Sequence, residues 1–229
     1  MAEHVADPGA DRMPHDATSP GAPPTDGRRS RGDRSRKAIT RRAVDLASLD
    51  GLDGLSFGRL ADELSVSKAG IQTLFRTKER LQLATIDEAR TVFVDTVIRP
   101  AATAPEGAER LWALIGNWID YATAPLFPGG CFWTANLAEF DSRPGPVRDA
   151  LMEQHHAWLA ALAHELRVAA DRGEIAAPEP EVTAFQLQAV LSAMNIALRW
   201  GDADSVRRAH RALDTLLAPS TRHSTSNTR

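Results

Sequence analysis

A short helical stretch carries small and hydrogen-bonding side chains on one face. These residues recur at i, i+3, i+4 and i+7: Ala69, Gln72, Thr73 and Arg76. Three large apolar residues fall on the opposite face: Ile71, Leu74 and Phe75. Small side chains allow close approach to a base pair, and a glutamine can pair bidentately with adenine in a major groove. The pattern therefore predicts a helix that is anchored on one side and reads DNA bases with the other.

A second short helix must position this one. It has an apolar stripe at helical spacing: Phe57, Leu60, Ala61 and Leu64. Ser56 is expected to cap its N-terminus, and Ser67 to cap the reading helix. The turn between them is Ser65-Val66-Ser67, in which Val66 is expected to point inward. Residues 56–75 thus have the organisation of a helix-turn-helix motif.

Phosphate contacts are expected around the same motif. Lys78 begins the next helix, where its charge and the helix N-terminal amides could meet one phosphate. Ser56, Ser67 and Lys68 offer similar contacts. The complete set of expected DNA-binding residues is Ser56, Ser67, Lys68, Ala69, Gly70, Gln72, Thr73, Arg76 and Lys78.

The segment from about Arg36 to Ala89 resembles the TetR/AcrR family of bacterial transcriptional regulators. The resemblance rests on Leu49–Ser56, on the run LADELSVSKAGIQTLFRTKERL and on the start of a long fourth helix. Gln72 and Leu74 stand where many relatives carry aromatic residues. The resemblance implies an all-α fold with an N-terminal three-helix DNA-binding domain and a C-terminal helical domain. It further implies an unidentified small-molecule effector, a palindromic operator, repression, and a homodimer formed by the last two helices, about 181–217.

Composition and helical patterns divide the chain into four parts. Residues 1–33 contain five prolines and four glycines and are expected to be a disordered arm. Residues 34–80 form the expected DNA-binding domain, 81–217 the effector-binding and dimerisation domain, and 218–229 a flexible tail. The fourth helix is expected from Lys78 to about Ile98, ended by Pro100. The later helices are expected at about 106–124, 132–140, 146–171, 180–200 and 203–217.

Charge changes sign at the expected domain boundary. Residues 34–80 contain ten Lys/Arg and six Asp/Glu, a net charge of +4, whereas residues 81–217 contain eleven and eighteen, a net charge of −7. Such asymmetry would orient the molecule on DNA, although ordinary surface scatter is the alternative. A basic cluster also closes the N-terminal arm: Arg28, Arg29, Arg31, Arg34, Arg36 and Lys37. This cluster could lie along DNA or serve only solubility.

The effector site is expected among aromatic residues concentrated in one third of the chain. The expected ligand-binding residues are Trp118, Phe132, Trp133, Asn136, His155 and Trp158. The alternative is that these side chains are ordinary core, with His155 a core histidine. Cys131 is the single cysteine, so no intrachain disulfide can form and a reducing compartment is expected. A role as a thiol sensor is disfavoured, because Cys131 has no partner cysteine.

Other features narrow the function. No apolar run reaches the ~18–20 residues of a membrane span, and the N-terminus lacks a signal-peptide pattern. A cytoplasmic location, no metal and no cofactor are therefore expected. The sequence lacks the glycine-rich phosphate loops, nucleophile elbows and Cys/His patterns of common enzymes. A ligand-responsive DNA-binding repressor is the favoured function. A constitutive DNA-binding adaptor and a helical enzyme with an incidental helix-turn-helix remain as alternatives.

Overall fold

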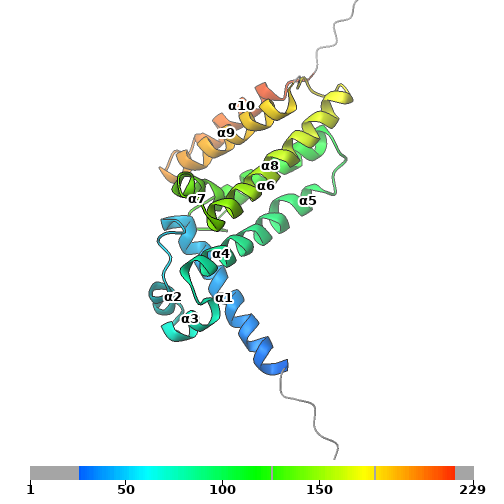
Figure 1. The fold of residues 1–229 in the computed structure, drawn as a ribbon. Coiled ribbons are helices and arrows are strands. Elements are labelled where there is room, and N and C mark those ends of the chain that lie inside the picture. The colour runs from blue at the N-terminus through cyan, green and yellow to red at the C-terminus, as the bar shows by residue number, and fades with distance from the viewer. Residues whose placement is uncertain (1–25, 125, 178, 220–229) are drawn as a thin grey trace, which may run out of the picture.

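The computed structural model describes residues 26–124, 126–177 and 179–219, with side chains from residue 32 onward. Within these residues the regular structure is entirely helical. Figure 1 shows α1–α3 at one end, α4 leading away from them, and the remaining long helices stacked above. The elements are α1 Asp26–Asp50, α2 Phe57–Leu64, α3 Lys68–Phe75, α4 Lys78–Phe93, a π-helical turn Val94–Ile98, α5 Arg99–Ala101, α6 Ala108–Thr123, α7 Phe132–Phe140, α8 Pro146–Asp171, α9 Pro180–Arg199 and α10 Ser205–Leu216.

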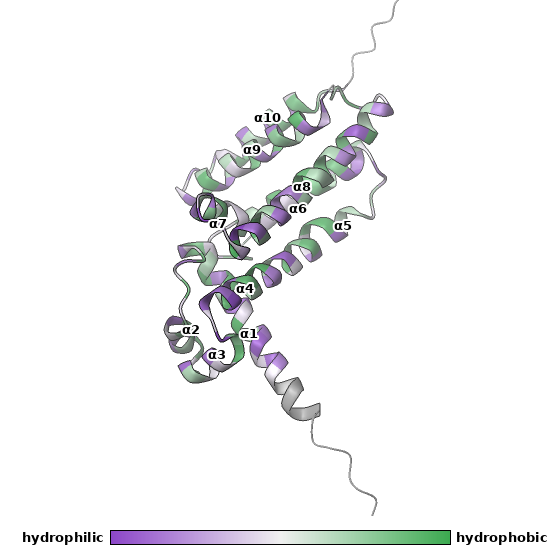
Figure 2. Cartoon of the chain, viewed as in Figure 1, coloured by the Kyte–Doolittle hydropathy of each residue, from purple (hydrophilic) through white to green (hydrophobic). Residues whose placement is uncertain are grey.

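The three N-terminal helices, α1–α3, pack around a shared set of apolar residues. Leu60 of α2 and Ile71 and Phe75 of α3 are buried, together with Ala43 and Ala47 of α1. Most helices show both hydrophobic and hydrophilic residues along their length (Figure 2). One buried apolar cluster runs from this unit into the C-terminal helices, so both parts share a continuous core.

Three local predictions are wrong. Helix α1 begins at Asp26, so residues 26–33 are helical rather than disordered, because the last proline is Pro24 and the arginines that follow favour helix. The fourth helix continues past Pro100 through the π-helical turn, and Pro100 lies in the first turn of α5, where no N–H is needed. Val66 is 47% exposed, because left-handed Ser65 (φ 53°) redirects the chain after α2.

The remaining parts of those predictions concern the termini. Residues 1–25 of the expected arm and 220–229 of the expected tail lie outside the described residues. The later helices lie within about two residues of the expected bounds, and α7 and α8 coincide with them.

Candidate nucleic-acid interface and effector domain

The expected reading face of α3 is exposed. All members of the set predicted to contact DNA within α3 are exposed: Lys68, Ala69, Gly70, Gln72 and Thr73. Arg76 follows the helix in a left-handed conformation (φ 64°) and is also exposed. The Thr73 hydroxyl donates a hydrogen bond to the Ala69 carbonyl at 2.8 Å, which leaves Gln72 as the unencumbered hydrogen-bonding side chain at mid-helix.

Three hydroxyl residues start the three helices around this face. Ser56, Ser67 and Thr77 have extended backbones, and each hydroxyl accepts a hydrogen bond from an N–H three residues later, at 3.1–3.2 Å. Each cap satisfies a donor that the helix itself cannot pair. Ser56, Lys68 and Lys78 also line one small hollow of about 260 Å³ between the starts of α2, α3 and α4. Three of the four residues predicted to contact phosphate thus line one hollow, and the fourth, Ser67, directly precedes Lys68.

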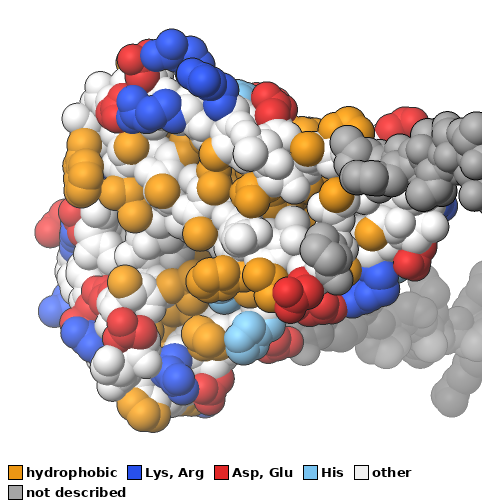
Figure 3. Space-filling model, turned by 90° about the horizontal axis from the view of Figure 1, so that it is seen from above, with side chains coloured by type: hydrophobic (Ala, Val, Ile, Leu, Met, Phe, Trp, Pro, Cys, Tyr) orange, Lys and Arg blue, Asp and Glu red, His pale blue; other side chains and the backbone are white. Residues whose placement is uncertain are grey.

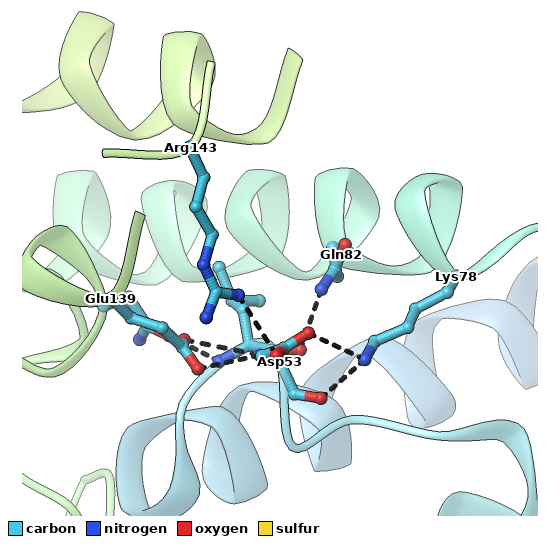
Figure 4. A network of polar contacts seen from close by, with 7 residues as sticks. Asp53, Lys78, Gln82, Glu139 and Arg143 are labelled. Carbon is cyan, nitrogen blue, oxygen red and sulfur yellow. Dashed lines mark hydrogen bonds and ion pairs between the residues drawn. The ribbon is translucent and has the colours of Figure 1, made fainter. Parts of the chain in front are cut away.

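Lys78 has an intramolecular partner that the sequence did not indicate. Its ammonium donates to the Asp53 carbonyl at 2.6 Å and to Asp53 Oδ1 at 2.9 Å (Figure 4). The other carboxylate oxygen, Oδ2, accepts from Arg143 at 3.1 Å. These contacts, chiefly the one with Lys78, lower the pKa of Asp53 below its ordinary value. Asp53 is therefore ionised at neutral pH and is shared by two cations.

The loop that carries Asp53 is hydrogen-bonded from two sides. The Leu52 N–H donates to Asn136 Oδ1 at 2.7 Å, and the Leu52 carbonyl accepts from Gln82 at 2.9 Å. The Asp53 N–H faces both oxygens of Glu139 at 3.3 Å. Gly51 has a φ of 77°, and a Cβ there would lie 2.6 Å from Glu139 Oε2. The tight turn therefore brings the α1–α2 loop against α7 of the C-terminal domain.

Asn136 is a structural connector in this arrangement. Its side chain is fully buried, and its amide donates to the Phe132 carbonyl at 2.7 Å and to the Ala47 carbonyl at 3.2 Å. Together with the bond from Leu52, the amide has three protein partners. Asn136 was predicted to bind a ligand, but its amide oxygen and nitrogen instead join α7 to the end of α1.

The predicted aromatic residues do come together, around a ring that sequence reasoning missed. Phe93, at the end of α4, lies 5.4 Å from Trp158, 5.4 Å from Tyr121 and 6.2 Å from Trp133, centroid to centroid. Phe132 packs edge-on against Trp133 at 4.8 Å. Trp118 lies 6.5 Å from Tyr121. All of these rings are buried, so they form a packed cluster that joins α4, α6, α7 and α8.

Polar groups lie at the edge of this aromatic cluster. The Trp158 indole N–H donates to Gln188 Oε1 at 2.7 Å, and Gln188 donates to the Ser192 hydroxyl at 2.8 Å. His155 is half-buried on α8, three residues before Trp158. Burial, and secondarily the neighbouring His156, lower the pKa of His155, which is therefore neutral at pH 7. Burial also raises the pKa of the Cys131 thiol, which disfavours its reactive thiolate.

Helix α9 presents an apolar face to solvent. Its inner stripe, including Leu187, Leu191 and Met194, is buried against α8 and α10. The exposed large hydrophobic residues on its outer side are Val182, Phe185, Ile196 and Trp200, and the last is 84% exposed. Figure 3 shows hydrophobic side chains gathered on the face seen from above, where α9 and α10 lie. Together with an adjoining groove of about 290 Å³ between α9 and α10, they form an apolar surface without a partner in the described chain.

Two further findings concern ions and membranes. Among the described residues, no three His, Cys, Asp or Glu side chains are grouped so that they could hold a metal ion. Within the same residues, no helix combines the length and the hydropathy needed to cross a membrane.

Comparisons with known proteins agree with this architecture. The model of the tetracyclin repressor-like C-terminal domain matches residues 107–213. No curated protein gives a significant sequence match. A TetR transcriptional regulator from Chloroflexus aurantiacus J-10-fl has a TM-score of 0.74 at 21% identity, with 81% of this chain and 95% of that chain covered.

Two other solved structures have bound ligands. A putative transcriptional regulator from Saccharomonospora viridis in complex with choline has a TM-score of 0.70 at 19% identity, with 80% of this chain and 95% of that one covered. AibR in complex with isovaleryl coenzyme A and operator DNA has a TM-score of 0.66 at 21% identity, with 80% and 98% covered. These likenesses show a shared fold.

The N-terminal segment resembles the TetR/AcrR family, and the C-terminal helices independently match the model of a tetracyclin repressor-like domain. The helix-turn-helix occupies α2 and α3, and the domain matched by the family model begins just before α6. Residues 107–213 thus belong to the tetracyclin repressor-like C-terminal domain family, and the chain as a whole has the fold of solved TetR regulators.

Proposed function

We propose that this protein is a homodimeric repressor that reads a palindromic operator with α3 and is released from it by a small molecule. The observation that carries the DNA-binding role is the exposed face of α3, on which Gln72 lies between small residues. The shared position of Ser56, Lys68 and Lys78 supports phosphate contacts beside it. The net charge of +4 over residues 34–80 supports the same orientation on DNA.

Base reading by Gln72 can be tested directly. Gln72→Ala is expected to lower affinity for operator DNA about tenfold, because one bidentate base contact contributes ~1–3 kcal/mol of discrimination. Affinity for unrelated DNA should hardly change. An operator can be selected from a random duplex library, and both affinities measured by fluorescence anisotropy. Gln154→Ala on α8 is the matched control. Equal losses on both kinds of DNA would remove Gln72 from base reading.

The outer face of α9 supports the dimer. Val182, Phe185, Ile196 and Trp200 recur on one side of the helix, and exposed Ala189 and Ala193 between them would allow close helix approach. A two-fold axis along this face would pair α9 and α10 with their copies, as expected for residues 181–217. A helix-turn-helix protein gains from such pairing because two recognition helices can then enter successive major grooves about 34–36 Å apart.

The aromatic cluster supports the effector site. The buried rings of Trp133 and Trp158 pack against Phe93, so a ligand that enters there must separate rings that now touch. Phe132 adjoins Trp133, and Trp118 adjoins Tyr121 in the same cluster. Phe93 belongs to α4, whose other end follows the recognition helix directly. Displacement of Phe93 by a ligand would therefore tilt α4 and change the spacing of the two recognition helices.

Ligand coupling has a thermodynamic signature. A ligand that releases operator DNA must itself bind more weakly to the DNA-bound protein, by the same factor. Choline and isovaleryl coenzyme A, which the two relatives bind, are suitable first probes for calorimetric titration with and without saturating operator. A ligand that releases DNA while its own affinity is indifferent to DNA would contradict this scheme.

A further inference from the structure

Asp53 forms ion pairs both within the DNA-binding unit and with the C-terminal domain. Its carboxylate accepts from Lys78 through Oδ1 at 2.9 Å and from Arg143 through Oδ2 at 3.1 Å. Lys78 opens α4 beside the recognition helix, whereas Arg143 lies between α7 and α8 (Figure 4). The two cations are 65 positions apart in the chain and share one acceptor.

Arg143 is held in place by α7. Its guanidinium lies 5.5 Å from the centroid of the Phe140 ring, and its backbone N–H donates to the Phe140 carbonyl at 3.2 Å. Phe140 is buried at the end of α7, and Glu139 beside it faces the Asp53 backbone. A displacement of α7 would therefore carry Arg143 away from Asp53.

The Asp53 carboxylate competes with DNA for Lys78. A lysine ammonium that is paired with a carboxylate attracts a phosphate oxygen less strongly, because the carboxylate offsets its charge. The uncompensated charge of Asp53 would also repel a phosphate approaching the hollow that Lys78 lines. A second cation on Asp53 weakens both effects, and Arg143 occupies that position.

We propose that Arg143 is a positioning residue for DNA binding: by pairing with Asp53 from the C-terminal domain, it makes Lys78 available to a DNA phosphate. The inference rests on the proposed DNA-binding function. It provides a route from the effector domain to the phosphate contact that runs through α7 and does not require α4 to tilt. Any ligand that shifts α7 would return Asp53 to Lys78 alone and weaken binding to every DNA sequence.

The test uses the full chain and a fixed, unselected DNA duplex of about 30 base pairs, long enough for two successive major grooves. Affinity is measured by anisotropy over a series of salt concentrations. Arg143→Gln is expected to weaken binding about threefold, since an exposed ion pair has a modest effect, and to reduce the salt slope. Arg148→Gln removes the same charge nearby but should change neither the affinity nor the salt slope, because Arg148 donates to the Asp141 carbonyl and not to Asp53.

Double variants separate this role from a loss of structure. In an Asp53→Asn background there is no charge to compensate, so Arg143→Gln should have no effect on DNA affinity. In a Lys78→Gln background the lysine that Asp53 competes for is missing and only the repulsion by Asp53 remains, so the effect of Arg143→Gln on DNA affinity should be clearly smaller. A general loosening of the loop would instead persist in full. Arg143→Lys should retain most of the wild-type affinity because it keeps the cation.

The outcomes distinguish the two proposals. Failure of the wild-type protein to bind any duplex at low salt would reject the proposed function itself. Wild-type binding with Arg143→Gln equal to Arg148→Gln, or with the same threefold loss in the Lys78→Gln background, would overturn the role of Arg143. A loss that is full when both Asp53 and Lys78 are present, smaller without Lys78 and absent without Asp53 would support it.

Discussion

Replacement of Phe185 and Trp200 together by glutamate is expected to convert the proposed homodimer into a monomer. The two rings are 66% and 84% exposed on the outer face of α9. Burial of one large apolar side chain contributes ~2 kcal/mol. A two-fold interface contains each of these rings once from each protomer, so both copies lose this contribution. The double variant should therefore raise the dimer dissociation constant at least about a thousandfold. Analytical ultracentrifugation over a range of concentrations measures this shift.

The dimer prediction has a matched control. Val66, in the turn between α2 and α3, is also a large exposed hydrophobic residue, 47% exposed, and α2 and α3 lie at the end of the molecule away from α9 (Figure 1). Val66→Glu makes the same kind of change in hydropathy and charge but should leave the dimer intact. The loss of dimerisation in the α9 variant should also lower its affinity for operator DNA, because each monomer then binds a single half-site. A Phe185→Glu/Trp200→Glu protein that sediments as the wild type would rule out this face as the interface.

Asn136→Leu is expected to destabilise the folded chain by about 2–3 kcal/mol, the cost of leaving a buried donor unpaired and losing the other amide bonds. The Leu52 N–H would lose Asn136 Oδ1, and nothing of similar polarity would replace it in a fully buried site. The Ala47 carbonyl also accepts from the Gly51 N–H at 3.1 Å and would remain paired. Urea unfolding monitored by tryptophan fluorescence measures the change in free energy of unfolding.

Asn117→Leu provides the comparison. Asn117 is only half-buried and donates one hydrogen bond, to the Val97 carbonyl at 3.0 Å. Its loss should cost about 1 kcal/mol. If both variants unfold at the urea concentration of the wild type, Asn136 does not hold α7 against α1 in the way described above.

Two of the contact sets that join the domains adjoin the proposed effector site. Phe93 ties α4 into the aromatic cluster, and Asn136 and Glu139 tie α7 to the α1–α2 loop. An effector that separated the rings around Phe93 would also move Trp133, which lies on α7 three residues before Asn136. Both proposed routes from a ligand to the DNA-binding residues would therefore begin at the same aromatic cluster.

The amino-acid sequence was sufficient for those features that depend on neighbours along the chain. Helical spacing identified Ile71 and Phe75 as the buried side of α3, because residues three and four apart share a helix face wherever that helix lies. Capping by Ser56 and Ser67 was predictable for the same local reason. Gly130 before α7, Pro146 at the start of α8 and Gly173 after α8 also mark helix ends in the sequence.

Tertiary structure alone decided which distant groups meet. Asp53, Glu139 and Arg143 have no periodic signal, and they come together only when α7 packs on the α1–α2 loop. Residue type singled out Asn136 and the tryptophans, but it did not reveal their contacts. A buried amide can hydrogen-bond to a backbone group of the other domain as readily as to a ligand, and Asn136 does so with Leu52. The outward direction of Phe185 and Trp200 likewise followed from which side of α9 packs on α8 and α10. Local periodicity fixes a helix and its faces, whereas burial depends on the surface that each face meets.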